Sequence, residues 1–135
     1  MDRLFLDANV LFSAAYGSPR ILEFWQLCKK RRCRLLATQY VMEEAKRNLH
    51  APEQLRRLDT LQREITIVPE APEGLSCRVK LPPGDQRVLL GAVAAGASHL
   101  VTGDVKHFGP YYGTKVHGVC IVRPSMYLQP SRKQR

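Results

Sequence analysis

The segment LFLDANVL, residues 4–11, places an acidic residue directly after a short apolar run. The apolar residues 4–6 leave no room for a helix before them, so they are predicted to form a buried strand. Asp7 follows this strand immediately, and Asn9 stands two residues further on. Because ligands of open α/β sheets collect where the strands end, Asp7 is the first candidate for a functional carboxylate.

Short apolar runs alternate with helical patterns through the rest of the chain. Further strands are predicted over residues 35–37, 65–68, 100–102 and 119–122. Helices are predicted from Pro19 to Lys30, from the N-cap Thr38 to about Leu49, from Pro52 onward, and from Asp85 to about Gly96. The segment 69–84 is rich in proline and glycine and is predicted to be a long loop. This alternation predicts an α/β fold with a mainly parallel sheet.

The length of 135 residues and the hydrophobic content of 44% suit one compact domain. We expect this domain to span residues 1–128, with residues 129–135 as a basic, disordered tail. Twenty-one Lys and Arg residues against twelve Asp and Glu residues give a formal net charge of +9. Such a charge favours polyanionic partners such as nucleic acid, although many small proteins are basic without a specific partner.

The first fifteen residues superficially resemble a secretion signal, but Asp7 and Asn9 interrupt the apolar run. No other stretch approaches the roughly 20 apolar residues of a membrane-spanning helix, so we expect a cytoplasmic protein without membrane contacts. The four cysteines are Cys28, Cys33, Cys77 and Cys120. They form no C-x-x-C pair, which argues against structural zinc and favours free thiols in a reducing compartment.

Two more aspartates stand at positions where a parallel sheet would bring them towards Asp7. Asp104 follows the strand predicted over residues 100–102, so Asp7 and Asp104 are expected at the same edge of the sheet. Asp85 begins the helix that leads into that strand. An aspartate at a helix start is often only a cap, and this alternative stays open for Asp85 when it is considered alone.

A fourth acid comes from the helix predicted over residues 38–49. At about 100° per residue, Glu44 lies at the rim of the buried stripe of this helix, whereas Glu43 points nearly opposite to it. Glu44 can therefore reach a cleft, and Glu43 is expected to face solvent. An ordinary surface position remains an alternative for either glutamate.

Four carboxylates that converge on one cleft repel one another unless a cation neutralises them. Oxygen ligands of this kind suit Mg²⁺ or Mn²⁺ rather than zinc. An ion held in this way activates a water molecule and stabilises charge on a phosphate. An acidic cleft on a strongly basic protein is therefore the arrangement that a nuclease needs.

These residues resemble the motifs of the PIN-domain ribonuclease family over nearly the whole chain, from about residue 3 to residue 128. The opening segment 4–11 looks like the strand, Asp, any residue, Asn and apolar pair of that family. Glu44, Asp85 and the segment Leu100–Asp104 with its Thr-Gly-Asp ending are similar to its second, third and fourth acidic positions. The match is closest to small bacterial members that are toxins of VapBC-type toxin–antitoxin pairs.

The resemblance implies a three-layer α/β/α sandwich around a five-stranded parallel sheet, and a metal-dependent endoribonuclease that hydrolyses RNA phosphodiester bonds. Asp7 and Asp104 would bind Mg²⁺ or Mn²⁺ directly, and Glu44 and Asp85 would bind it directly or through water. Asn9 and Thr102 would support these ligands or contact a phosphate. The resemblance also implies an antitoxin partner and a homodimer.

A basic run follows the helix that starts at Pro19. Its cations are Lys29, Lys30, Arg31, Arg32 and Arg34. The helix macrodipole favours these cations at the end of the helix, and they are also a candidate RNA-binding surface. Tyr111 and Tyr112 are candidates for stacking on a base or for loop packing. His107 is a candidate substrate contact, although a lone His beside Phe108 is more often structural. Trp25 is expected in the core or at a dimer interface.

Two other functions fit part of this pattern. Aspartyl-phosphate phosphatases also carry an Asp after the first strand, but they need a second Asp two residues later, where this chain has Asn9. A catalytically inactive RNA- or protein-binding module on the same fold is the other alternative, because a fold does not determine a function. The presence of all four acids argues against it.

Overall fold

The computed structural model describes residues 1–128, so the tail expected over residues 129–135 lies outside the described residues. The strands are β1 (Asp2–Leu6), β2 (Cys33–Thr38), β3 (Ile65–Val68), β4 (His99–Val101), β5 (Lys115–Val116) and β6 (Val119–Val122). The helices are α1 (Ala8–Ala15), α2 (Pro19–Lys29), α3 (Gln39–Arg47), α4 (Pro52–Gln62), α5 (Pro83–Ala94), α6 (Val105–Phe108), η1 (Gly109–Tyr111) and α7 (Pro124–Tyr127).

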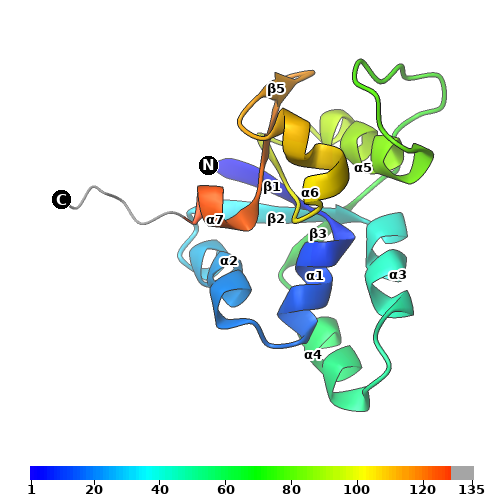
Figure 1. Ribbon diagram of the computed structural model, residues 1–135. Helices are drawn as coiled ribbons and strands as arrows, with labels where there is room; N and C mark the ends of the chain where they lie inside the picture. The colour runs from blue at the N-terminus through cyan, green and yellow to red at the C-terminus, as the bar shows by residue number, and fades with distance from the viewer. Residues whose placement is uncertain (129–135) are drawn as a thin grey trace.

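The strands form one sheet in the order β3-β2-β1-β4-β6-β5. The first five strands of this order are parallel, and the two-residue β5 adds an antiparallel hairpin with β6. Helices α1, α2 and α4 lie on one side of the sheet and α5 lies on the other (Figure 1). The predicted α/β sandwich is confirmed, with the short β5 as the one strand beyond the five parallel strands that were expected.

The direction in which successive strands are added to the sheet reverses at β1, in the centre. It runs from β1 outward through β2 to β3, and then crosses back to place β4 and β6 on the other side of β1. The carboxyl ends of β1 and β4 therefore form the topological switch point, where open α/β sheets bind their ligands. Register supports this pairing, because Leu6 lies opposite Val101 and the Asp7 N–H donates to Val101 O at 3.0 Å.

The central strand is buried on both faces, as a parallel sheet covered by helices requires. Leu4, Phe5 and Leu6 are fully buried and belong to one hydrophobic cluster with residues from both helical layers. Trp25 belongs to the same core at 3% exposure, and its Nε1 donates to Leu61 O at 3.0 Å. The four cysteines are unpaired, as expected. Within residues 1–128, no helix has the length and apolar character to cross a membrane.

Several boundaries differ from those predicted from the sequence. Thr38 caps α3 as expected, with its Oγ1 accepting from the Val41 N–H at 3.3 Å, but α3 ends at Arg47. Helix α5 starts at Pro83 rather than at Asp85, because proline suits the first helical turn. Asp85 therefore lies within that turn and does not occupy the cap, which is Pro82. The short elements α1, α6, η1 and β5 were not predicted.

Candidate metal centre

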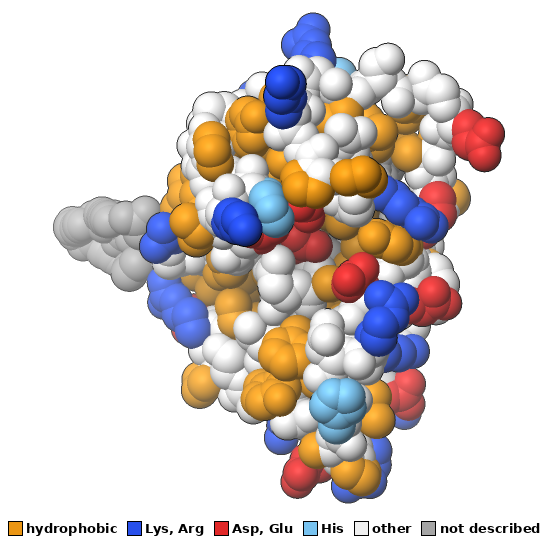
Figure 2. Space-filling view, turned by 45° about the vertical axis from the view of Figure 1, so that its right-hand side comes forward, with side chains coloured by type: hydrophobic (Ala, Val, Ile, Leu, Met, Phe, Trp, Pro, Cys, Tyr) orange, Lys and Arg blue, Asp and Glu red, His pale blue; other side chains and the backbone are white. Residues whose placement is uncertain are grey.

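A cleft of about 560 Å³ opens at the carboxyl ends of β1 and β4. Its walls come from the starts of α1 and α5 and from one face of α3. The lining includes all four predicted acids, Asp7, Glu44, Asp85 and Asp104. Figure 2 shows acidic side chains gathered in a hollow of this face, with basic side chains on either side of it.

Asp7 lies at the base of the cleft as the N-cap of α1 and is only 5% exposed. Its Oδ1 accepts from the Ala8 N–H at 2.7 Å, and its Oδ2 accepts from the Thr102 hydroxyl at 2.8 Å. Burial raises the pKa of this carboxyl to about 6, against the opposing effect of these two hydrogen bonds. The charges of Asp85 and Asp104 raise it further. A buried carboxylate that faces two others is electrostatically suited to a bound cation.

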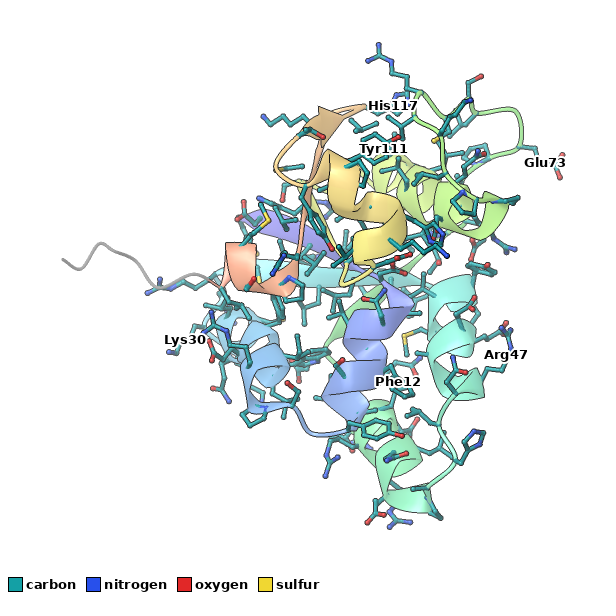
Figure 3. All side chains as sticks on the ribbon, viewed as in Figure 1. Phe12, Lys30, Arg47, Glu73, Tyr111 and His117 are labelled. Atoms are coloured by element: carbon teal, nitrogen blue, oxygen red, sulfur yellow. The ribbon has the colours of Figure 1, made fainter. Side chains whose placement is uncertain are left out.

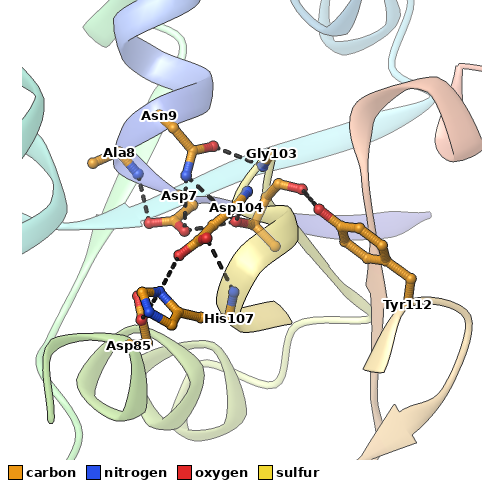
Figure 4. Close-up of polar contacts among 9 residues, drawn as sticks. Asp7, Ala8, Asn9, Asp85, Gly103, Asp104, His107 and Tyr112 are labelled. Atoms are coloured by element: carbon orange, nitrogen blue, oxygen red, sulfur yellow. Dashed lines mark hydrogen bonds and ion pairs between the residues drawn. The ribbon is translucent and has the colours of Figure 1, made fainter. Parts of the chain in front are cut away.

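Asn9 and Thr102 hold the two strand ends together around Asp7. Figure 4 shows Asn9 between Asp7 and Gly103. Asn9 Nδ2 donates to Asp7 Oδ2 at 3.2 Å, and Asn9 Oδ1 accepts from the Gly103 N–H at 2.7 Å. Thr102 is fully buried, and its Oγ1 also accepts from the Asp104 N–H at 3.1 Å. Both residues therefore contact the acids themselves, which fits the supporting role expected for them.

Asp104, Asp85 and His107 form the outer part of the cleft. Asp104 caps α6 by accepting from the His107 N–H at 3.1 Å, and its Oδ2 lies 2.8 Å from His107 Nδ1. The same nitrogen lies 3.1 Å from Asp85 Oδ2, so one imidazole contacts carboxylates from two elements (Figure 4). Burial, and then the charge of Asp104, raises the pKa of Asp85, whereas His107 lowers it.

Glu44 lines the cleft from α3, whereas the neighbouring Glu43 is exposed and faces away from it. The Glu44 side chain is 40% exposed and pairs with Arg47 at 3.7 Å. One helical turn earlier, Tyr40 also lines the cleft, and its pKa is raised by burial and by a hydrogen bond and charge from Glu44. The geometry therefore favours Glu44 over Glu43, in line with the helical spacing.

A second cluster joins the α3 and α5 walls of the cleft. The Arg87 guanidinium lies 3.9 Å from the centre of the Tyr40 ring and 3.3 Å from Glu70 Oε1. Glu70 Oε2 in turn accepts from the Tyr40 N–H at 3.1 Å, at the start of α3. These contacts connect the helix that carries Glu44 to the helix that carries Asp85, so they define the width of the cleft.

The basic run predicted as an RNA-binding surface lies away from the acids. The basic run Lys29, Lys30, Arg31, Arg32 and Arg34 precedes and begins β2, at the amino end of the sheet, whereas the acids lie at the carboxyl end. Figure 3 shows Lys30 on the far side of the molecule from Arg47. Both tyrosines make packing contacts through their hydroxyl groups. Tyr111, at the end of η1, donates to Lys80 O at 3.3 Å, and Tyr112, directly after η1, donates to Thr102 O at 2.8 Å.

The residues of the cleft fit a divalent ion. The donors are carboxylate oxygens and one imidazole nitrogen, and single atoms of Asp85, Asp104 and His107 all lie within 4.8 Å of one another. Carboxylate ligands suit Mg²⁺ and Mn²⁺, which are hard cations. His107 is the candidate donor that the sequence analysis did not assign to the site. The sequence feature that could have identified His107 is its position three residues after Asp104 at the start of a helix. This spacing places both side chains on the same face of the helix.

The fold and the cleft define an α/β protein with an acidic centre at its topological switch point. Residues 3–106 match the sequence profile of the PIN domain, so the chain belongs to the PIN-domain family. Among solved structures, it is similar to VapBC2 from Rickettsia felis, crystallised with a DNA fragment from their promoter. That match has a TM-score of 0.65 and 15% identity and covers 90% of this chain and 98% of the other. No curated protein sequence matches the chain.

Proposed function

We propose that the chain is a metal-dependent endoribonuclease that hydrolyses RNA phosphodiester bonds. The observation that carries the proposal is the convergence of Asp7, Glu44, Asp85 and Asp104 on one cleft of a PIN-domain protein. Four carboxylates placed together are costly without a cation. Burial is the main cause of the raised pKa values of Asp7 and Asp85, and the charges of neighbouring carboxylates raise both values further. A nuclease centre accounts for an arrangement that a purely structural role does not need.

Each acid has a role in this proposal that follows from its contacts. Asp7 and Asp104 hold Mg²⁺ or Mn²⁺ directly, and Asp85 and Glu44 complete the set directly or through water. When bound, such an ion supplies an activated water and stabilises negative charge on the phosphate. Thr102 and Asn9 keep the Asp7 carboxylate in place by donating hydrogen bonds to its Oδ2.

The substrate class follows from charge as well as from family. A net charge of +9 attracts polyanions, and exposed cations such as Arg47 stand beside the acidic cleft. The acids alone would repel an RNA backbone, so binding requires the ion and these neighbouring cations together. We propose RNA as the substrate on these grounds.

We further propose that the chain is the toxin component of a toxin–antitoxin pair and that it forms a homodimer. The similarity of the fold to VapBC2 from Rickettsia felis supports an antitoxin partner. Co-purification of the protein with the product of a neighbouring small gene tests the partner, and sedimentation equilibrium tests the dimer. A monomer that no neighbouring gene product binds would contradict this part of the proposal.

The first experiment is cleavage of a mixed RNA pool by the wild type and by Asp7→Asn, with Mg²⁺, with Mn²⁺ and with EDTA. We expect cleavage with either ion, and we expect EDTA and the substitution each to abolish it. Cleavage that survives the substitution would show that the site is misassigned. An absence of cleavage in every condition would favour a catalytically inactive binding module on the same fold.

A further inference from the structure

His107 stands among the acids of the cleft although no feature of the four-carboxylate pattern requires it. We infer that His107 Nδ1 is a direct ligand of the ion, so that the centre prefers Mn²⁺ to Mg²⁺. This inference rests on the proposed function, because it assumes that the acids hold a divalent ion. It adds a nitrogen ligand to a set expected to consist of carboxylates alone.

The spacing of the side chains carries the first part of the argument. His107 Nδ1 lies 2.8 Å from Asp104 Oδ2 and 3.1 Å from Asp85 Oδ2. Neighbouring ligands of a six-coordinate ion lie roughly 3 Å apart when each is about 2.1 Å from the metal. His107 Nδ1 is therefore spaced from each carboxylate as one ligand is from a neighbouring ligand of the same ion, and all three atoms lie within 4.8 Å of one another.

The backbone explains why the imidazole is held in this place. Asp104 caps α6, and its Oδ1 accepts from the backbone N–H of His107 at 3.1 Å. The cap and the three-residue spacing turn both side chains towards the same side of α6, where Asp85 meets them from α5. Among residues 1–128, no hydrogen bond engages His107 Nε2, so this nitrogen is available to carry the ring proton while Nδ1 binds the ion.

The same distances also suit a purely positioning role, in which Nδ1–H donates to both carboxylates. The two roles differ in what occupies Nδ1, a proton or the ion. They also differ in ion preference, because Mg²⁺ selects oxygen ligands whereas imidazole nitrogen suits first-row transition metals. An asparagine at position 107 separates them, since its amide N–H can replace the donor at Nδ1 but cannot replace an imidazole ligand.

The experiment uses the full chain without RNA and Mn²⁺ alone as the probe. Pulsed electron paramagnetic resonance detects the nuclear coupling of a nitrogen bound directly to Mn²⁺. We compare the wild type, the wild type labelled with nitrogen-15 histidine, His107→Asn and the control His50→Asn. His50 is exposed and lies beyond the end of α3, so it reports the effect of losing a histidine elsewhere.

We expect imidazole coupling in the wild type, a shifted pattern after labelling, no coupling in His107→Asn and an unchanged pattern in His50→Asn. Calorimetric titration should show Mn²⁺ affinity weakened at least about ten-fold in His107→Asn, the lower end of the loss when a group that supports a metal site is removed. Mg²⁺ affinity should change much less, so the preference for Mn²⁺ should fall.

Manganese bound without imidazole coupling in the wild type would overturn the inference and leave the proposed function standing. Coupling that persists in His107→Asn would assign the nitrogen to another histidine and overturn it too. A wild type that binds no Mn²⁺ would remove both the ligand assignment and the metal dependence of the proposed nuclease. Because the labelled wild type is informative alone, the test does not depend on the folding of a variant.

Discussion

The Oδ1 atom of Asn9 accepts a hydrogen bond from the backbone N–H of Gly103 at 2.7 Å, which ties the segment after β1 to the segment after β4. The amide nitrogen of the same side chain donates to Asp7 Oδ2. One residue thus joins both ends of the topological switch point and orients the buried acid between them. A Cβ atom at position 103 would lie 3.3 Å from Asn9 Oδ1, so glycine suits this close approach.

The substitution Asn9→Ala should lower the free energy of unfolding by about 0.5–1.5 kcal/mol, because it removes the hydrogen bonds to the Gly103 N–H and to Asp7 Oδ2. Urea denaturation in EDTA measures this effect without a contribution from bound metal. Asn48→Ala is the matched control. Asn48 is exposed, and within residues 1–128 its side chain makes one hydrogen bond, to Glu44 O at 3.4 Å, so its loss should change stability by less than about 0.5 kcal/mol. Equal effects at the two positions would contradict the assigned role of Asn9.

The buried Asp7 should make the stability of the metal-free protein depend on pH. Its pKa is about 6 in the folded protein against an ordinary value of 3.8, so the folded state holds the proton more tightly than the unfolded state. Stability therefore falls as pH rises from about 4 to about 6 and then levels off. Because one pKa unit is about 1.4 kcal/mol, the loss approaches about 3 kcal/mol.

Chemical denaturation in EDTA across this pH range measures the effect. Asp7→Asn should remove this part of the pH dependence, whereas the control Asp59→Asn, on an exposed position of α4, should retain it. Mg²⁺ added at pH 7.5 should stabilise the wild type, because ion binding to the folded state compensates the charge of Asp7. A wild type whose stability does not fall between pH 4 and 6 would show that Asp7 is not held in this environment.

The adjacent pair Glu43 and Glu44 tests which face of α3 belongs to the site. Glu44 lines the cleft and Glu43 is exposed, with only a 3.4 Å contact from Gln39. Glu44→Gln should reduce RNA cleavage with Mg²⁺ and weaken Mn²⁺ binding, because it removes one carboxylate from the set. Glu43→Gln should leave both unchanged. If the two substitutions have the same effect, the assignment of Glu44 rather than Glu43 to the site is wrong.

Much of the fold follows from local sequence patterns, because short β-branched or leucine-rich runs alternate with helices that have proline or threonine at their starts. Helix α1 was not predicted, because its sequence ANVLFSAA is mostly apolar and continues the apolar run of β1, with Asn9 and Ser13 as the polar residues of the helix. Its burial against α3 and α4 is a tertiary effect. The two-residue β5 is likewise too short for a periodic pattern to identify.

The acids could be predicted because parallel strands bring their carboxyl ends to one edge, and because helical spacing separates Glu44 from Glu43. The contact between His107 and Asp85 could not be predicted in this way. It depends on how α5 packs beside α6, which joins residues 22 positions apart through no local rule. The position of the basic run relative to the acids also emerges only from the strand order, because the run lies before a strand and the acids lie after strands.

The distance between the basic run and the cleft leads to a prediction about RNA binding. Arg47 pairs with Glu44 on α3, and the exposed Lys106 lies two residues after Asp104 on α6, so both cations belong to elements that carry or are capped by acids of the cleft. Lys30 and Arg32 precede β2, at the amino ends of the parallel strands and thus opposite to the cleft. The double substitution Arg47→Gln with Lys106→Gln should therefore raise the KM for an RNA of a few nucleotides, whereas Lys30→Gln with Arg32→Gln should leave it unchanged.

The salt dependence of RNA binding distinguishes a loss of phosphate contacts from a disturbed site. The two double variants can be compared directly because each of them removes two positive charges. Every phosphate contact to single-stranded RNA contributes about 0.7 to the slope of the logarithm of affinity against the logarithm of salt concentration. The slope should fall by up to about 1.4 in the cleft variant and stay constant in the other. A reduced slope in the Lys30 and Arg32 variant, with a short RNA as substrate, would show that the basic run binds the substrate despite its place at the far edge. Such a result would require the RNA to pass around the sheet rather than across the cleft.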